Sequence, residues 1–179
     1  KQYEFDRSIK DIFIANVGDG GRDSYPIHIN ERLLEEIYFP PFKACLKAGS
    51  RSIMTAYNSL NGVACSSNNW LLQEKLKNQL GFTGFVISDA NAVGGELVLH
   101  NTAKDYPASG QHAINSGLDV IFQTEYKHHT LFIPVFFDGS IDTNRVNDAV
   151  ARVLKAKFEL GLFDEPYVEI ENKSVEEEH

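Results

Sequence analysis

The order of elements in residues 52–95 constrains the fold most, because these residues read as strand, loop, helix, strand and loop. Residues 52–57 alternate as a short strand does, and turn-forming residues follow them. Leucines at helical spacing predict a helix over 68–80, with Gly81 in the position that ends a helix. The apolar run 84–87 predicts a strand that is buried on both faces of a parallel sheet.

An acidic residue, Asp89, comes directly after this buried strand and is preceded by Ser88. In α/β enzymes the loops at the carboxyl ends of parallel strands open onto the ligand site. A carboxylate at this place therefore predicts a catalytic or binding group. The alternative is that Asp89 only caps a turn, and the spacing by itself leaves both interpretations open.

Length and composition set limits on the kind of protein. The chain has 179 residues, of which 42% are hydrophobic and 23% are charged, so it is long enough to bury a core. Its net charge of −8 argues against nucleic acid or an anionic membrane as the main partner, because both need a basic surface. No apolar run approaches the about 20 residues that span a bilayer. Cys45 and Cys65 match no zinc or redox spacing and are expected to be small buried residues.

Strand and helix patterns alternate four times along the chain. The strands are expected at 12–17, 52–57, 84–87 and 117–122. Helices are expected from Asn30 as N-cap to about 47, with a kink or break at Pro40 and Pro41, then over 68–80, about 107–116, 131–138, and from Asp142 or Thr143 onward. The last helix carries an apolar stripe of Val146, Val150, Val153, Leu154 and Phe158.

Four β-α units are half of the eight that close a (β/α)8 barrel of about 250 residues. An open four-stranded parallel sheet would leave backbone groups unpaired and an apolar face uncovered. We therefore expect an α/β fold in which residues 12–168 form half of a TIM-type (β/α)8 barrel. A missing segment, a separate chain or a symmetric copy of this chain would complete it. Alone, such a half is expected to be unstable or to aggregate.

Three motifs of the central stretch also occur in the order and spacing of one enzyme family. They are M-T-A-Y-N at 54–58, N-x-x-L-L at 68–72 and L-G-F-x-G-F-V-x-S-D at 80–89. With them the chain resembles the family 3 glycoside hydrolases, the β-glucosidase-like retaining enzymes, from about residue 18 to residue 167. The resemblance implies that the four units are strands five to eight of the catalytic barrel, its C-terminal half, and that Asp89 is the catalytic nucleophile.

The resemblance further implies an exo-acting, β-glucosidase-like hydrolase that acts by retaining double displacement on a β-linked glucoside or oligosaccharide. It implies neither a metal nor an organic cofactor. Residues 1–11 stay unassigned, and the charged residues 169–179 are expected to be an exit linker toward a second domain. The family points to a periplasmic or extracellular location, with a cytoplasmic location as the alternative.

Three residues fall on substrate-binding positions of the family, namely Arg22, Met54 and Tyr57. A guanidinium suits the vicinal hydroxyls of a sugar, and a tyrosine hydroxyl at the end of its strand could orient the nucleophile. Each has an alternative: Arg22 could pair with a neighbouring aspartate (Asp19 or Asp23), Met54 could fill the core, and Tyr57 could pack its ring. Asn58 and Ser88 are expected to support the site.

The sequence also departs from the family pattern. A retaining glycosidase needs two carboxyl groups, and no motif here supplies the second, so the acid/base is expected from outside this chain. The family has a Lys-His pair eleven and ten residues before the arginine; counting back from Arg22 reaches Asp11 and Ile12, and a shift by one residue finds Lys10 before Asp11. Ala90 stands where many members have a tryptophan. These departures motivate an alternative function, a catalytically inactive carbohydrate-binding or scaffold half-barrel.

Overall fold

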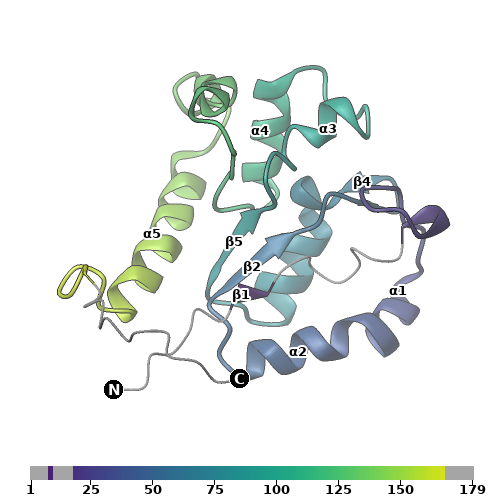
Figure 1. Cartoon of the computed structure of the whole chain (residues 1–179), viewed down its shortest axis with the longest axis horizontal. Coiled ribbons are helices and arrows are strands. Elements are labelled where there is room, and N and C mark those ends of the chain that lie inside the picture. Colours follow the sequence, from purple (N-terminus) through teal and green to yellow (C-terminus); the bar gives the residue numbers. More distant parts are fainter. Residues whose placement is uncertain (1–7, 10–17, 168–179) are drawn as a thin grey trace, which may run out of the picture.

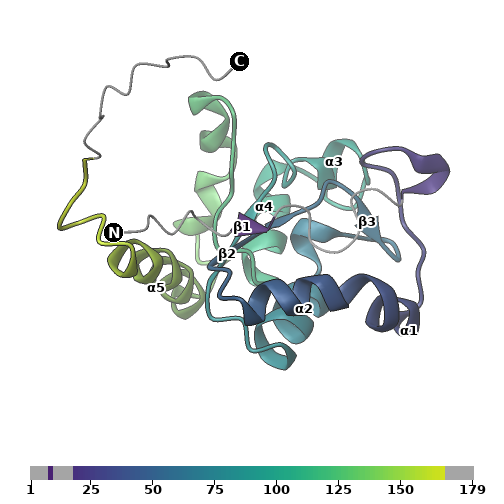
Figure 2. The same ribbon diagram turned by 60° about the horizontal axis from the view of Figure 1, so that its bottom comes forward.

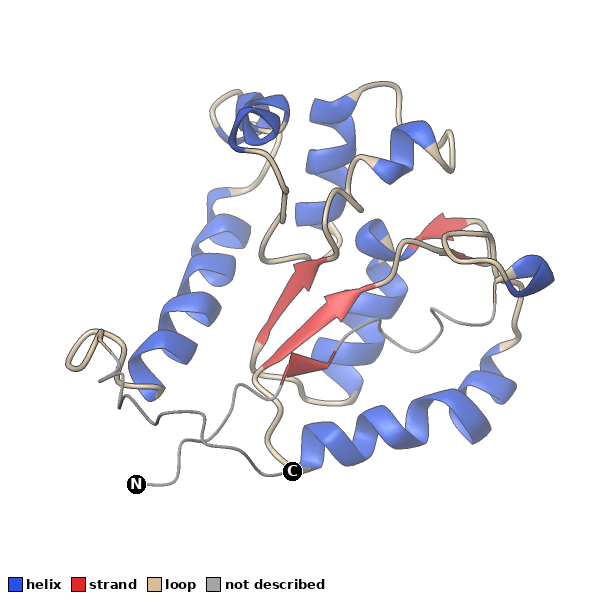
Figure 3. Ribbon diagram, in the orientation of Figure 1, coloured by secondary structure: helices blue, strands red, loops and turns tan. Residues whose placement is uncertain are grey.

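A three-stranded parallel sheet lies at the centre of the computed structural model, which describes residues 8–9 and 18–167. Its strands are β1 (Ser8–Ile9), β2 (Ser52–Thr55) and β5 (Phe85–Ser88), in this order across the sheet. The arrows of β2 and β5 run side by side and end at the same edge (Figure 3). The chain is thus α/β, as expected, and β1 lies in the segment that had stayed unassigned.

Helices surround the sheet. Figure 1 shows α2 along one side of the strands and α5 along the other, with α3 and α4 beyond the carboxyl ends of β2 and β5. Figure 2, turned by 60°, keeps α2 and α5 on separate sides. The helical elements are η1 (Asp19–Gly21), α1 (Glu31–Leu33), η2 (Leu34–Tyr38), α2 (Phe39–Lys47), η3 (Cys65–Ser67), η4 (Trp70–Gln79), α3 (Gly95–Val98), α4 (Tyr106–Asn115), η5 (Tyr126–Leu131), η6 (Ile133–Phe136) and α5 (Thr143–Glu159).

The strand expected at 117–122 is shorter than predicted. It makes one parallel bridge to β5, between Val120 and Ile87. The carbonyl oxygen of Val86 accepts from the N–H groups of both Asp119 and Val120, at 2.9 and 3.0 Å, so the regular ladder is interrupted there. The segment still follows β5, because Ser88 N–H donates to Val120 O at 3.0 Å.

The first helical region does not break at its two prolines, so of the predicted kink or break the break is absent. It runs without interruption from α1 through the π-helical η2 into α2, where Pro40 and Pro41 lie in the first turn. The wider π turn changes the hydrogen-bond pattern just before the prolines, so their missing N–H groups are accommodated. Asn30 caps the start as expected, with its side chain accepting from Leu33 N–H at 3.0 Å.

Several local predictions are confirmed. The helix predicted over 68–80 is η4, and Gly81 after it has a φ of +67°. The turn after β2 is a hairpin between β3 (Ser59–Leu60) and β4 (Val63–Ala64), with Asn61 and Gly62 both in the left-handed region. Asp142, not Thr143, caps α5.

The two faces of the sheet differ in burial. On one face Ile53 and Val86 pair in register and are fully buried against leucines of η4, namely Leu71, Leu72 and Leu76. On the other face Met54 pairs with Ile87, and both are only half-buried, as is Phe85. The prediction of burial on both faces is therefore wrong for the described part of the chain.

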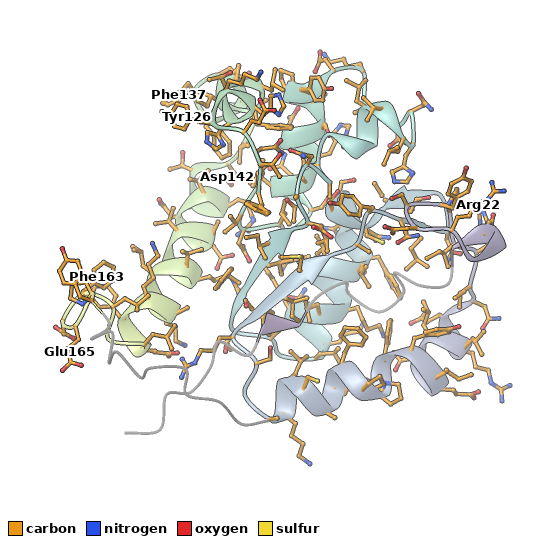
Figure 4. All side chains as sticks on the ribbon, in the orientation of Figure 1. Arg22, Tyr126, Phe137, Asp142, Phe163 and Glu165 are labelled. Atoms are coloured by element: carbon orange, nitrogen blue, oxygen red, sulfur yellow. The ribbon has the colours of Figure 1, made fainter. Side chains whose placement is uncertain are left out.

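The apolar stripe that the sequence predicts on α5 is mostly exposed. Phe158 is 64% exposed, and Val150 and Leu154 are exposed too. The residues that α5 buries are Ala149 and Ala156. Figure 4 shows Phe137 and Phe163 beyond opposite ends of this helix, on the outside of the molecule.

Cys65 is buried, which raises the pKa of its thiol to about 12, but Cys45 is exposed, contrary to expectation. The strand expected at 12–17, the Lys10–Asp11 pair and the linker at 169–179 lie outside the described residues. In the described part, no helix is long and apolar enough to cross a membrane.

Candidate functional site

The candidate site lies at the carboxyl edge of the sheet, where neighbouring chain segments leave it together. Asp89 follows the last residue of β5, and Tyr57 lies two residues after the end of β2. Asp89 is 7% exposed, and Tyr57 is half-buried. The structure thus brings both residues to one edge, as the strand pattern predicts.

The Asp89 carboxylate takes part in the turn that follows β5. Its Oδ1 accepts from the N–H of Ala90 at 2.7 Å, and its main-chain oxygen accepts from the N–H of Ala92 at 3.1 Å. The turn-capping interpretation therefore describes a real interaction of this carboxylate. It is compatible with a chemical role, because the turn also holds the side chain at the sheet edge.

Tyr57 is connected to this turn. Its hydroxyl donates to the main-chain oxygen of Ala90 at 2.8 Å. The main-chain oxygen of Tyr57 lies 2.8 Å from Nε2 of His100. Through its hydroxyl, Tyr57 thus contacts the residue after Asp89, and its role in orienting the nucleophile stays a prediction.

The Asp89 turn is also tied to the segment after Val120. Asn91 N–H donates to Phe122 O at 3.0 Å, and Nδ2 of Asn91 donates to Oγ1 of Thr124 at 3.1 Å. Ser88, which is fully buried, accepts from Phe122 N–H through its Oγ at 2.9 Å. Asn91 has a φ of +62°, a conformation that asparagine tolerates better than most residues. The turn is therefore held from both neighbouring segments.

Asn58 connects the end of β2 to the loop that carries Arg22. It is fully buried, and its Nδ2 donates to the main-chain oxygen of Tyr25 at 2.8 Å. Arg22 itself is exposed: its guanidinium lies 5.1 Å from the centre of the Tyr25 ring and donates to the Tyr25 hydroxyl at 3.3 Å. Among the described residues it forms no ion pair with Asp19 or Asp23. Figure 4 shows it at the outer end of the η1 loop.

Two residues near the edge were not anticipated as part of a site. His100 and Asn91 act through hydrogen bonds between loops, and neither belongs to a local pattern that predicts such a contact. A third group lies behind them: the Glu96 carboxylate is buried, accepts from Ser67 Oγ at 2.9 Å and lies 3.1 Å from Nδ1 of His112. It joins η3, α3 and α4.

Over residues 8–9 and 18–167, no three or more His, Cys, Asp or Glu side chains are grouped so that they could hold a metal ion. The chemistry that this edge can offer comes from the carboxylate of Asp89, the hydroxyl of Tyr57 and the hydrogen bonds that position them.

The family comparison matches most of the chain. The model described as the glycosyl hydrolase family 3 N terminal domain matches residues 12–156. A periplasmic β-glucosidase of Salmonella typhimurium is 34% identical over 167 residues, which cover 93% of this chain and 21% of that protein. A β-xylosidase of Formosa agariphila is 33% identical and covers 83% of this chain and 21% of its own length. The chain thus spans about a fifth of these relatives.

Solved structures agree with the sequence comparison. A β-glucosidase from Erythrobacter marinus superposes with a TM-score of 0.82 at 31% identity, covering 88% of this chain and 21% of that one. A Listeria innocua β-glucosidase in complex with glucose gives a TM-score of 0.81 at 28% identity, covering 89% and 22%. These relatives are named as enzymes, which does not favour the catalytically inactive alternative.

Proposed function

Because the chain belongs to glycosyl hydrolase family 3, we propose that it supplies the nucleophile of a retaining, exo-acting β-glycosidase of the β-glucosidase type. One observation carries the proposal. Asp89, the carboxylate in the family's S-D motif, is held by a hydrogen-bonded turn at the carboxyl edge of a parallel sheet. Catalytic groups of α/β barrels occupy this edge.

The reaction is a double displacement. The Asp89 carboxylate attacks the anomeric carbon while the glycosidic bond to the leaving oxygen breaks, and a glycosyl ester forms. A second carboxyl group protonates the leaving oxygen and then takes a proton from the water that hydrolyses the ester. That acid/base comes from outside this chain. No step requires a metal or an organic cofactor.

The neighbouring residues have distinct roles in this proposal. Tyr57 holds the turn that carries Asp89, as its bond to Ala90 indicates. Met54, on the half-buried face of the sheet, lines the sugar pocket, and Arg22 binds sugar hydroxyls by leaving Tyr25. Asn58 and Ser88 support these residues through hydrogen bonds. Asn58 bonds to the loop that carries Arg22, and Ser88 bonds to the main chain of Phe122.

The chain is, in this proposal, the C-terminal half of a (β/α)8 barrel. A helix follows each of the four strand positions, β1, β2, β5 and Val120. The half-buried face with Met54 and Ile87, together with the exposed stripe of α5, marks the surfaces that the other half would cover. The other half and a second domain belong to the same protein, to a separate chain or to a homo-oligomer.

The substrate is a β-linked glucoside. Similar structures carry glucose and laminaribiose, and the relatives are named β-glucosidases and β-xylosidases. The relative from Salmonella typhimurium is named periplasmic, which supports a location outside the cytoplasm for this protein as well.

Covalent trapping tests the nucleophile. The complete protein is incubated with a 2-deoxy-2-fluoro-β-glucoside, and the labelled peptide is identified by mass spectrometry. We expect the label on Asp89 and none in Asp89→Asn, whose turnover should fall by at least about three orders of magnitude, the scale for a catalytic nucleophile. Asp105→Asn is the matched control, since an asparagine can keep the cap that Asp105 provides to α4. A label elsewhere, or an active Asp89→Asn, contradicts the proposal.

A further inference from the structure

We propose that His100 is a positioning residue that fixes Tyr57 and, through Tyr57, the turn that carries Asp89; its effect on the reaction rests on the function proposed above. Nε2 of His100 lies 2.8 Å from the main-chain oxygen of Tyr57. A carbonyl oxygen only accepts hydrogen bonds, so Nε2 is the donor and carries the hydrogen.

The His100 bond holds the main chain of Tyr57 beyond the end of the sheet ladder. The ladder between β2 and β5 ends at the pair Thr55 and Ser88, two residues before Tyr57. The His100 bond joins Tyr57 to a segment 43 residues away in the sequence. Beyond the end of the strand, this bond holds the main chain as a ladder hydrogen bond would.

The main chain around His100 is itself held by hydrogen bonds to α3. Its N–H donates to Gly95 O at 3.0 Å, and Thr102 N–H donates to Glu96 O at 2.9 Å, so both sides of His100 are tied to α3. The buried carboxylate of Glu96 binds Ser67 of η3 and His112 of α4. Glu96 thus joins η3, α3 and α4 next to His100, and the imidazole connects this group of elements to Tyr57 at the sheet edge.

The connection continues to the nucleophile. Tyr57 donates through its hydroxyl to Ala90 O at 2.8 Å, and Ala90 directly follows Asp89 and donates to its carboxylate. Without the imidazole, the main chain of Tyr57 loses this bond from His100, and the Asp89 turn gains freedom. A catalytic carboxylate that is less well placed slows the chemical step more than it weakens substrate binding.

A pair of variants of the complete protein tests whether the hydrogen bond from His100 to Tyr57 positions the site. His100→Leu keeps the bulk of the side chain and removes the donor, while His100→Gln places an amide N–H where Nε2 was. We expect kcat of His100→Leu to fall about tenfold, the scale of one hydrogen bond, with KM changed less than about twofold. His100→Gln should recover most of that loss. His128→Leu, at a half-buried histidine of η5, is the control and should leave kcat unchanged.

A double-mutant cycle tests whether His100 acts through Tyr57. If it does, adding His100→Leu to Tyr57→Phe should reduce kcat by less than about twofold more, because coupled residues are not additive. Full multiplication of the two losses would overturn the proposal, and so would equal activity of the leucine and glutamine variants.

Hydrogen exchange gives a readout that does not depend on turnover. Amides of residues 57–60 and 89–92 should exchange faster in His100→Leu and at the parent rate in His100→Gln. Unchanged exchange of these amides in His100→Leu would overturn the proposal that His100 fixes Tyr57. If the parent protein hydrolyses no β-glycoside but His100→Leu still exchanges faster than the parent, the positioning by His100 is upheld while the proposed function fails.

Discussion

The hydroxyl of Tyr57 lies 2.8 Å from the main-chain oxygen of Ala90 and donates a hydrogen bond to it. This bond crosses from the end of β2 to the turn after β5. Asp89 shares that turn, since its Oδ1 accepts from the N–H of Ala90. A tyrosine that follows the neighbouring strand is thus bonded to the turn that carries the carboxylate.

Removing only the hydroxyl should affect rate rather than folding. We expect Tyr57→Phe to lower kcat about tenfold, because one positioning hydrogen bond is lost while the ring stays in place. The free energy of unfolding should change by less than about 1.5 kcal/mol. Steady-state kinetics and denaturant unfolding of the complete protein measure both. An unchanged kcat would show that the bond does not position Asp89.

Asn91 offers a test of backbone conformation in the same turn. Its φ of +62° suits glycine and strains alanine. Asn91→Ala should therefore lower the free energy of unfolding by about 1–3 kcal/mol, the cost of a left-handed non-glycine residue plus a lost side-chain bond.

Asn91→Gly separates the two causes. It relieves the strain and removes the bond from Nδ2 to Thr124, so it should destabilise less than alanine does. Denaturant unfolding of both variants decides. Equal losses would assign the whole effect to the side chain and none to the left-handed backbone.

Local patterns predicted several elements of the fold. The leucine spacing gave the position of η4, and Asn30 and Asp142 were recognised as caps, because caps and periodicity depend on residues only a few positions apart. The course of the chain at Pro40 and Pro41 could not be predicted, since a π turn and a break satisfy the same residues locally. The sequence predicted the apolar stripe of α5 but not its exposure, because an apolar face does not reveal which other part of the protein covers it.

The candidate site was predictable only in part. The strand ends placed Asp89 and Tyr57 at one edge, because parallel strands end together. His100 and Asn91 were missed, since their partners lie 43 and 33 residues away in the sequence and no spacing rule joins loops. Arg22 was expected at the sugar and is found on Tyr25, an arrangement that depends on how the η1 loop packs.

A buried ion pair gives a prediction about stability. Lys77 Nζ lies 2.8 Å from Oδ1 of Asp119, and both side chains are almost fully buried. Asp119 also pairs with Arg145 and accepts from Val86 N–H at 2.8 Å. Asp119→Leu leaves Lys77 as a buried charge without this carboxylate and should cost about 3–5 kcal/mol.

Lys77→Met should cost less than about 1.5 kcal/mol, because Arg145 still compensates Asp119 and a methionine fills similar space. Unfolding of the two variants, side by side, measures the asymmetry. A Lys77→Met loss as large as that of Asp119→Leu would mean that Arg145 does not compensate Asp119.

The same lysine should give stability a specific pH dependence. Burial lowers the pKa of Lys77 from 10.5 to about 8. Between these values the unfolded chain binds more protons than the folded one at this site, so its contribution to the free energy of unfolding rises with pH. Below pH 8 lysine is charged in both states and this rise is absent. The parent should therefore gain stability relative to Lys77→Met from pH 8 toward 10.5, and a constant difference would contradict the lowered pKa.

The exposed stripe of α5 makes opposite predictions for the isolated chain and for the complete protein. Phe158 is 64% exposed and its ring lies 4.4 Å from that of Phe163, so the isolated chain of 20.1 kDa presents an apolar patch. Native mass measurements should find it self-associated, and Phe158→Asp should shift it toward the monomer. Val98→Asp, at a residue of α3 that is 61% exposed, is the control and should not.

In the complete protein, Phe158→Asp should instead lower the free energy of unfolding by more than about 2 kcal/mol, because the other half of the barrel would bury the new charge. Val98→Asp should stay within about 0.5 kcal/mol, as surface changes do. Phe158→Asp should thus reduce self-association of the isolated chain but destabilise the complete protein, and a face that the other half covers requires both effects. A wild-type chain that stays a stable monomer alone, together with a harmless Phe158→Asp in the complete protein, would mean that nothing packs on this face and that the barrel is not completed there.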